Sequence, residues 1–204
     1  MTLTIADTRQ LIVWITQCNY LLRGMMKYIP LLAKRDVTDP ALKDKWESYP
    51  YDLAIFHAWA HVPDTFVAYT KFNRTVWVEE DGGMPLLLKE LAVVQTSVLS
   101  NSSYEWGNHG RAMISRGGTQ AQVDALVLGE TESNLFSETE KLIIQYATEV
   151  TIDAVPKEQT LDAMGKIFTN KQIMELTFAI GAYMLNSRTA NLCGLNIGDD
   201  KAFN

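Results

Sequence analysis

The segment from Met84 to Asn101, MPLLLKELAVVQTSVLSN, constrains the fold more than any other part of the sequence. Its apolar residues lie almost all around a helix, and Lys89 and Glu90 are its only charged residues. A helix that is apolar on every side is buried rather than placed on a surface. Pro85 suits the first turn of such a helix, because proline lacks only an N–H that the helix leaves unused there. The sequence therefore predicts a buried helix that begins near Pro85.

The same helical periodicity extends through most of the chain. Between clusters of Gly, Pro, Ser and Asp, apolar residues recur with helical rather than alternating spacing. Ser137 and Glu140 form a capping box, Thr169 suits an N-cap, and Gly117 or Gly118 can end a helix in the left-handed conformation. We therefore predict an all-α fold of about eight or nine helices. The main segments run over about 6–32, 52–59, 63–77, 85–101, 103–117, 119–129, 138–150, 157–168 and 170–193, with a shorter one at 40–46. The first is either continuous or broken near Gly24 or Pro30.

The composition is that of an ordinary globular protein. Residues AVILMFWYC make up 47% and DEKR 21% of the 204 residues, which excludes disorder of the whole chain. The net charge of -6 argues against a nucleic-acid partner. No run of about 18 apolar residues occurs, so we expect no membrane span. Cys18 and Cys193 match no metal or redox spacing, and we expect a reduced, cytoplasmic location.

Glu105 and His109 are the strongest candidates for acid–base chemistry. They are four residues apart, so a helix places them on one face. A carboxylate next to an imidazole orients the ring and favours its protonated form, as a general acid–base pair requires. Tyr104 and Trp106 flank the pair and make its surroundings partly apolar. The alternative is an ordinary solvent-exposed Glu–His pair.

Glu90 is the third candidate, because a carboxylate is rarely buried without a partner. It either sits at an edge and pairs with Lys89 or Arg111, or faces an internal cavity and a cationic or protonated group. Arg111, Arg116 and Arg188 are candidate carboxylate clamps, or simply surface charges. Both alternatives stay open at this point.

A metal site is the weaker interpretation of His57 and His61. Their i,i+4 spacing can ligate a metal, but a third ligand would have to come from elsewhere. We expect instead one inward and one surface histidine, and no metal or cofactor. Gly107 inside a predicted helix costs about 1 kcal/mol relative to alanine, so it indicates a close approach of another element or of a ligand.

Residues 85–118, PLLLKELAVVQTSVLSNSSYEWGNHGRAMISRGG, resemble the core of the carboxymuconolactone decarboxylase-like, or alkylhydroperoxidase D-like (AhpD-like), family. The preceding AHVPDTFVAY and the tail NKQIMELTFAIGAYMLNSRTANLCGL are also similar to it, and the resemblance covers roughly residues 52–198. It implies an all-α fold that forms homo-oligomers, commonly trimers or hexamers. We expect residues 1–50 to form an N-terminal helical arm and residues 51–204 the AhpD-like domain.

The resemblance also implies which residues act. The peroxidase branch of the family uses a Cys-x-x-Cys and a histidine with an upstream glutamate. Those positions are Ser102, Glu105, His109 and Glu90 here, and without the two cysteines the disulfide route to peroxide reduction is chemically excluded. The decarboxylase branch has a glutamate four residues before the histidine, as this chain does. It implies that His109 donates a proton, that Glu105 orients it or relays the proton, and that Glu90 sets the local field.

The sequence thus leads to three hypotheses. The first is a decarboxylase-like lyase or isomerase that acts on a small carboxylated or lactone-like substrate. Its substrate-binding residues would be Tyr104, Trp106, Ser102, Asn108 and His61. The second is a redox protein of the same family with a mechanism that does not use Cys-x-x-Cys. The third is an oligomeric small-molecule-binding protein without catalysis.

Overall fold

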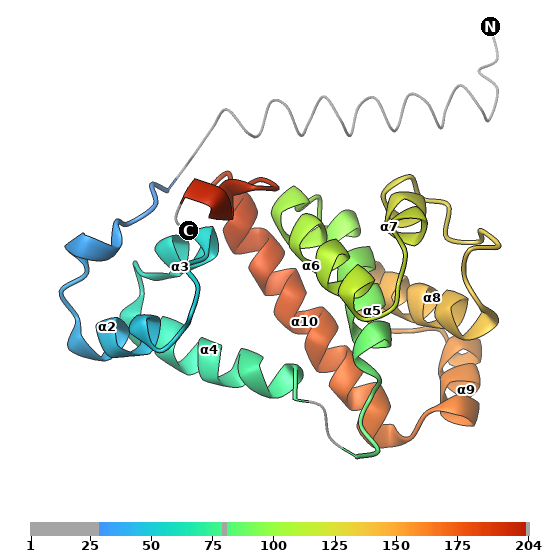
Figure 1. The fold of residues 1–204 in the computed structure, drawn as a ribbon. Helices are drawn as coiled ribbons and strands as arrows, with labels where there is room; N and C mark the ends of the chain where they lie inside the picture. The colour runs from blue at the N-terminus through green and yellow to red at the C-terminus, as the bar shows by residue number, and fades with distance from the viewer. Residues whose placement is uncertain (1–28, 79–80, 203–204) are drawn as a thin grey trace, which may run out of the picture.

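The structure is a computed structural model, and it describes residues 29–78 and 81–202 (Figure 1). In these residues we find nine α-helices, two short 3-10 helices and no strand, so the predicted all-α fold is confirmed. The α-helices are α2 (Pro40–Glu47), α3 (Ala54–Trp59), α4 (Pro63–Val76), α5 (Leu86–Leu99), α6 (Ser103–Ser115), α7 (Gln120–Val127), α8 (Glu138–Asp153), α9 (Glu158–Ile167) and α10 (Asn170–Leu192). The 3-10 helices are η1 (Lys34–Asp36) and η2 (Asp199–Ala202).

Helix α5 is the buried helix that the sequence predicts. It packs against α6, α8 and α10, and the four residues from Leu91 to Val94 are completely buried. Lys89 is buried as well, and its ammonium group lies 3.0 Å from Glu175 and 3.0 Å from the backbone oxygen of Val76. A buried charge is stable only with such partners, so this contact fixes the end of α4 against α5 and α10.

The apolar side chains form two main cores. One surrounds α5, α7 and α8, and the other joins α2, α3 and α4 to the end of α10. The second core is largely aromatic, since Trp46 lies 5.8 Å from Phe66 and 6.2 Å from Phe56 between ring centroids. Trp46 belongs to α2, inside the predicted N-terminal arm. The boundary at residue 50 stays a prediction, but part of the arm packs into this core.

Local sequence signals account for most of the helix ends. Pro63 occupies the first position of α4. Ser137 accepts a hydrogen bond from the backbone N–H of Glu140, whose side chain in turn accepts from Ser137 N–H, so this capping box is confirmed. Thr169 forms a second capping box with Gln172 at the start of α10. These caps satisfy N–H groups that a helix cannot satisfy itself.

The predicted helix over residues 6–32 falls mostly on residues 1–28, which lie outside the described residues. Residues 29–33 are not helical, so its predicted end at Leu32 is wrong. Pro30 has no N–H to donate, and the N–H of Leu32 donates instead to the backbone oxygen of His57 at 3.0 Å. This segment therefore runs along α3 rather than continuing a helix. Within the described part of the chain, no helix is long and apolar enough to cross a membrane.

Candidate active site

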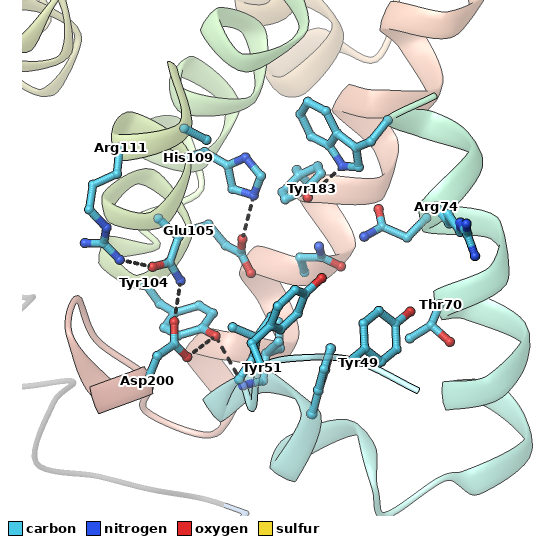
Figure 2. Close-up of a pocket in the computed structure, with 18 of the residues that line it drawn as sticks. Tyr49, Tyr51, Thr70, Arg74, Tyr104, Glu105, His109, Arg111, Tyr183 and Asp200 are labelled. Carbon is cyan, nitrogen blue, oxygen red and sulfur yellow. Dashed lines mark hydrogen bonds and ion pairs between the residues drawn. The ribbon is translucent and has the colours of Figure 1, made fainter. Parts of the chain in front are cut away.

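A cavity of about 720 Å³ lies between α4 and α6, and α3, α5, α10, η2 and the loop before α3 also contribute to its wall (Figure 2). His109, Glu105 and Glu90, the three predicted catalytic residues, all line it. They come from two helices, because Glu90 lies on α5 and the other two on α6. A volume of this order is typical of a small-molecule site.

Glu90 holds one side of the His109 ring. Its Oε2 lies 2.6 Å from His109 Nδ1, and its Oε1 accepts a hydrogen bond from Arg116. The Glu90 side chain is only 2% exposed, whereas that of Arg116 is 31% exposed. Both carboxylate oxygens of Glu90 are therefore occupied. Glu90 fixes which nitrogen of His109 points into the cavity, and Arg116 compensates the buried charge.

Two aromatic side chains fix the plane of the same ring. Trp77 stacks on His109 with 5.4 Å between ring centroids, and Tyr183 meets it edge-on at 4.3 Å. The indole N–H of Trp77 donates to the Tyr183 hydroxyl at 3.0 Å, which locks the two rings together. Arg116 lies 5.1 Å from the centre of the Trp77 ring. His109 is therefore held by hydrogen bonding and by packing at once.

Glu105 occupies the other side of the ring. Its Oε2 lies 3.8 Å from His109 Nε2, and its side chain is 4% exposed. Its Oε1 is buried without a hydrogen-bond partner among the described residues. Burial raises the pKa of Glu105 to about 7, while the charge of His109 lowers this value and that of Asp200 raises it. At neutral pH this carboxyl group can therefore either give or take a proton.

Asp200 organises the neighbouring part of the wall. Its Oδ1 accepts from the Tyr104 hydroxyl at 2.7 Å and from the Ala54 N–H at 2.8 Å, while its Oδ2 accepts from Asn108 at 3.1 Å. Figure 2 shows Tyr104, Asp200 and Arg111 on the same side of the cavity as Glu105. The η2 segment thus ties α3 to α6 directly beside the acid–base residues.

Gly107 explains how the C-terminal segment can lie so close to α6. A Cβ added at Gly107 would meet the side chain of Ile197 at 2.5 Å. The predicted close approach is therefore made by the segment that leads to Asp200. A side chain at position 107 would have to displace Ile197 from this contact.

The structure brings some of the predicted substrate-binding residues to the cavity and not others. Tyr104 and Asn108 line it, whereas Trp106, Ser102 and His61 do not. Trp106 packs against the core around α5, and Ser102 is completely buried. His61 is exposed, with its Nε2 2.7 Å from the backbone oxygen of Pro30.

The open question about Glu90 is resolved in favour of an internal cavity and cationic or protonated partners. The alternative pairs with Lys89 and Arg111 are wrong, because Lys89 pairs with Glu175 and Arg111 donates to Asn108. Adjacent residues on a helix point in different directions, so the neighbouring side chains of Lys89 and Glu90 reach different partners.

His57 on α3 and His61, which follows the end of α3, do not form a shared metal site. His57 is buried, with its Nδ1 2.8 Å from the backbone oxygen of Leu32, and His61 is exposed, as predicted. Among the described residues, no group of three or more His, Cys, Asp or Glu side chains could hold a metal ion. Cys193 is buried and does not line the cavity, and Cys18 lies outside the described residues.

Sequence reasoning missed several residues of the wall, namely Tyr49, Tyr51, Asn73, Trp77, Tyr183 and Asp200. Most of them carried no local signal, because their partners are distant in sequence. A further wall residue, Asn186, did carry a local signal, because a polar residue seven positions after Ala179 falls on the buried face of α10. Tyr183 lies on that same face, and both line the cavity.

Comparisons with known proteins give structural neighbours only. No family model matches the chain, and no curated protein matches its sequence. An AhpD-core, peroxidase-related protein from Ralstonia eutropha is 18% identical, with a TM-score of 0.71 over 84% of this chain and 92% of its own. A peroxidase-related protein from Silicibacter is 17% identical, with a TM-score of 0.68 over 86% and 96%.

A third neighbour is a debrominase solved in complex with 2,3,4-tribromopyrrole. It is 15% identical, with a TM-score of 0.66 over 87% of this chain and 95% of its own. At identities this low, the comparison shows a common fold. The chain therefore has the AhpD-like fold, as the sequence resemblance implied.

Proposed function

We propose that this protein is a decarboxylase-like lyase or isomerase of the AhpD-like family, which acts on a small carboxylated or lactone-like compound by proton transfer. The observation that carries this proposal is the position of Glu105. Its unpartnered Oε1 is buried beside the cavity, and its Oε2 lies 3.8 Å from His109 Nε2. A buried acid with a pKa near 7 next to an oriented imidazole is suited to moving protons at neutral pH.

The contacts support distinct roles for the three residues. Glu90, held by Arg116, orients His109 through Nδ1. His109 then presents Nε2 to the cavity as the proton donor. Glu105 relays protons to and from His109, a role that its unoccupied oxygen supports.

In a decarboxylation, the bond between the substrate's carboxylate and its α-carbon breaks and CO₂ leaves. The electron pair of that bond passes into the adjacent carbonyl as an enolate. His109 donates its Nε2 proton to the α-carbon, and Glu105 returns a proton to His109. The net reaction consumes one proton and needs no oxidant or reductant. An isomerisation would use the same residues, with a proton removed from one carbon and returned to another.

The charges of the cavity wall support an anionic substrate. Arg74, Arg111 and Arg116 all line the cavity. Arg116 pairs with Glu90 and Arg111 donates to Asn108, whereas Arg74 forms no ion pair within the described part of the chain. Arg74 is therefore the candidate for attracting an anionic substrate into the cavity.

A redox function is the second candidate, and the peroxidase-related neighbours favour it. The family's cysteine positions hold Ser102 and Glu105 here, so such a function would depend on Cys18 or Cys193. It predicts peroxide consumption that disappears when both are replaced by serine. Peroxide consumption that survives both replacements would reject this candidate. A purely ligand-binding protein would show neither activity.

The proposal is tested by CO₂ release and solvent proton exchange over a panel of small lactone acids and β-keto acids. We expect His109→Asn to lower turnover by about a hundred-fold to ten-thousand-fold, the range of general acid–base catalysis. Glu132→Gln, at an exposed loop position outside the cavity, is the control and should retain full turnover. Full activity of His109→Asn, with its fold intact, would contradict the proposal.

Three further expectations stay predictions. They are a homo-oligomer, most simply a trimer or hexamer, a cytoplasmic location, and the division of the chain at residue 50. Sedimentation of the full chain tests the first of them directly.

A further inference from the structure

The wall of the cavity that faces His109 is built from aromatic rings. Tyr49 and Tyr51 come from the loop between α2 and α3, and Phe56 comes from α3. The ring centroids of Tyr49 lie 5.6 Å from Tyr51 and 5.0 Å from Phe56. Figure 2 shows Tyr49 and Tyr51 across the cavity from His109. Rings arranged in this way offer π-faces and edges to a planar ligand.

The faces of the other aromatic residues are already covered. Trp77 is stacked on His109 and contacts Arg116, and Tyr183 packs against both rings. Tyr51, in contrast, is 48% exposed although it lines the cavity. The aromatic surface that a ligand can reach is therefore mainly the ring of Tyr51, with Tyr49, which Lys45 and Phe56 cover in part, beside it.

Two buried oxygens of the cavity wall have no hydrogen-bond partner among the described residues. One is Oε1 of Glu105 and the other is Oδ1 of Asn73. An amide oxygen only accepts hydrogen bonds, so a ligand satisfies Asn73 with an O–H or N–H group. Leaving such a group unsatisfied in a buried site is unfavourable, which favours ligands that carry the donor.

The size of the cavity sets a further limit. At about 720 Å³ it lies within the range that holds drug-sized ligands. A single small lactone would leave much of it unfilled. The volume therefore favours a larger compound.

We propose that the cavity binds a planar aromatic acid that carries a hydroxyl group. The ring lies against Tyr49 and Tyr51, the hydroxyl donates to Asn73, and the carboxyl-bearing carbon lies beside His109. This inference rests on the proposed function and names its substrate class.

The proton-transfer residues suit such a substrate. A proton from His109 forms a new C–H bond at the ring carbon that bears the carboxylate. The C–C bond to the carboxylate then breaks, its electron pair restores the aromatic ring, and CO₂ leaves. The hydroxyl group promotes this step because it donates electron density to the ring. The net reaction consumes one proton and requires no redox partner.

The test is calorimetric binding to the full chain of three matched probes. The first is a hydroxynaphthoate with its hydroxyl and carboxylate on opposite rings, the second is its methyl ether, and the third is the saturated decalin carboxylate. We expect the hydroxynaphthoate to bind at least about tenfold more tightly than either analogue. Similar affinity for all three probes, or no binding of any, would overturn the inference.

Two variants locate the preference. Tyr51→Leu should weaken hydroxynaphthoate binding by about tenfold and leave the decalin carboxylate within about twofold. Asn73→Ala should abolish the preference for hydroxyl over methyl ether. Phe72→Leu and Asn134→Ala, at exposed positions outside the cavity, are the controls and should bind as the original chain does. Unchanged selectivity in Tyr51→Leu and Asn73→Ala would place the ligand elsewhere.

Binding and turnover separate the two proposals. Selective binding of the hydroxynaphthoate without CO₂ release or proton exchange from any acid would contradict the proposed function alone. Turnover of aliphatic β-keto acids without any preference for the aromatic probe would contradict the substrate class alone.

Discussion

The two sides of the His109 ring differ in a way that separates support from reactivity. On the Nδ1 side, Glu90 uses both oxygens, one for His109 and one for Arg116. On the Nε2 side, Glu105 is as deeply buried but leaves one oxygen without a partner. Equal burial therefore has opposite consequences. The fully paired carboxylate of Glu90 holds the ring, whereas burial with an unpartnered oxygen raises the pKa of Glu105 to about 7.

The largest expected loss of stability comes from replacing Glu90. In Glu90→Gln, the imidazole of His109 and the guanidinium of Arg116 both lose their carboxylate partner. A hydrogen bond to a charged group contributes about 1.5–3 kcal/mol, and this change weakens two of them, so we expect a loss of about 3 kcal/mol of unfolding free energy. Chemical denaturation measures it, with Glu132→Gln as a control that should stay within about 0.5 kcal/mol of the original chain. A loss no larger than that of the control would show that Glu90 is not the support we describe.

Glu105→Gln should act in the opposite direction and depend on pH. The native pKa of about 7 lies above the unfolded value of 4.5, so the native state binds more protons between these values. The contribution of Glu105 to stability is therefore full below about pH 4.5 and is lost as pH rises through 7. The shift corresponds to about 3 kcal/mol. We expect Glu105→Gln to gain stability relative to the original chain over this window, by an amount of this order.

Denaturation at a series of pH values checks this expectation. The difference between Glu105→Gln and the original chain should grow from about pH 4.5 to pH 7 and then level off. A difference that is independent of pH would show that Glu105 titrates normally, and the contrast with Glu90 would disappear.

Asp200→Asn should give the smallest effect of the three variants, a modest shift of the pKa of Glu105. Asp200 raises the pKa of Glu105 through its negative charge, so the neutral variant should lower that pKa by roughly one unit or less. The pH window of the stability difference, measured in the Asp200→Asn background, should move down accordingly. Asp199→Asn is the matched control, because Asp199 is adjacent in η2 but does not line the cavity. An equal shift in both variants would assign the effect to overall charge.

The elements that sequence predicted well were those with local causes. Any helix places Glu105 and His109 on one face, because they are four residues apart. The apolar residues all around α5 predict its burial without knowledge of its neighbours. The same reasoning singled out Glu90 but left open whether it sits at an edge or faces an internal cavity. It left the partner of Glu90 open, because Arg116 lies on a different helix and at its end.

The rest of the site depends on tertiary contacts that one sequence does not encode locally. Trp77 stacks on a histidine 32 positions later, and Asp200 accepts from Tyr104 across 96 positions. Tyr51 lies in a loop without periodicity, directly after the predicted domain boundary at residue 50, and Tyr49 lies just before that boundary. Trp106, expected at the substrate, faces the core instead, since it is one residue further around α6 than Glu105.

The most direct test is the titration of the Glu105 carboxyl group itself. Carbon-13 NMR of protein labelled at its glutamate side chains follows each carboxyl group, and the signal missing from Glu105→Gln identifies the one of interest. We expect this carboxyl group to titrate with a pKa of about 7. Titration near the ordinary value of 4.5 would contradict it, because Glu105 would then be an ordinary charged carboxylate rather than a proton-exchanging group in the cavity.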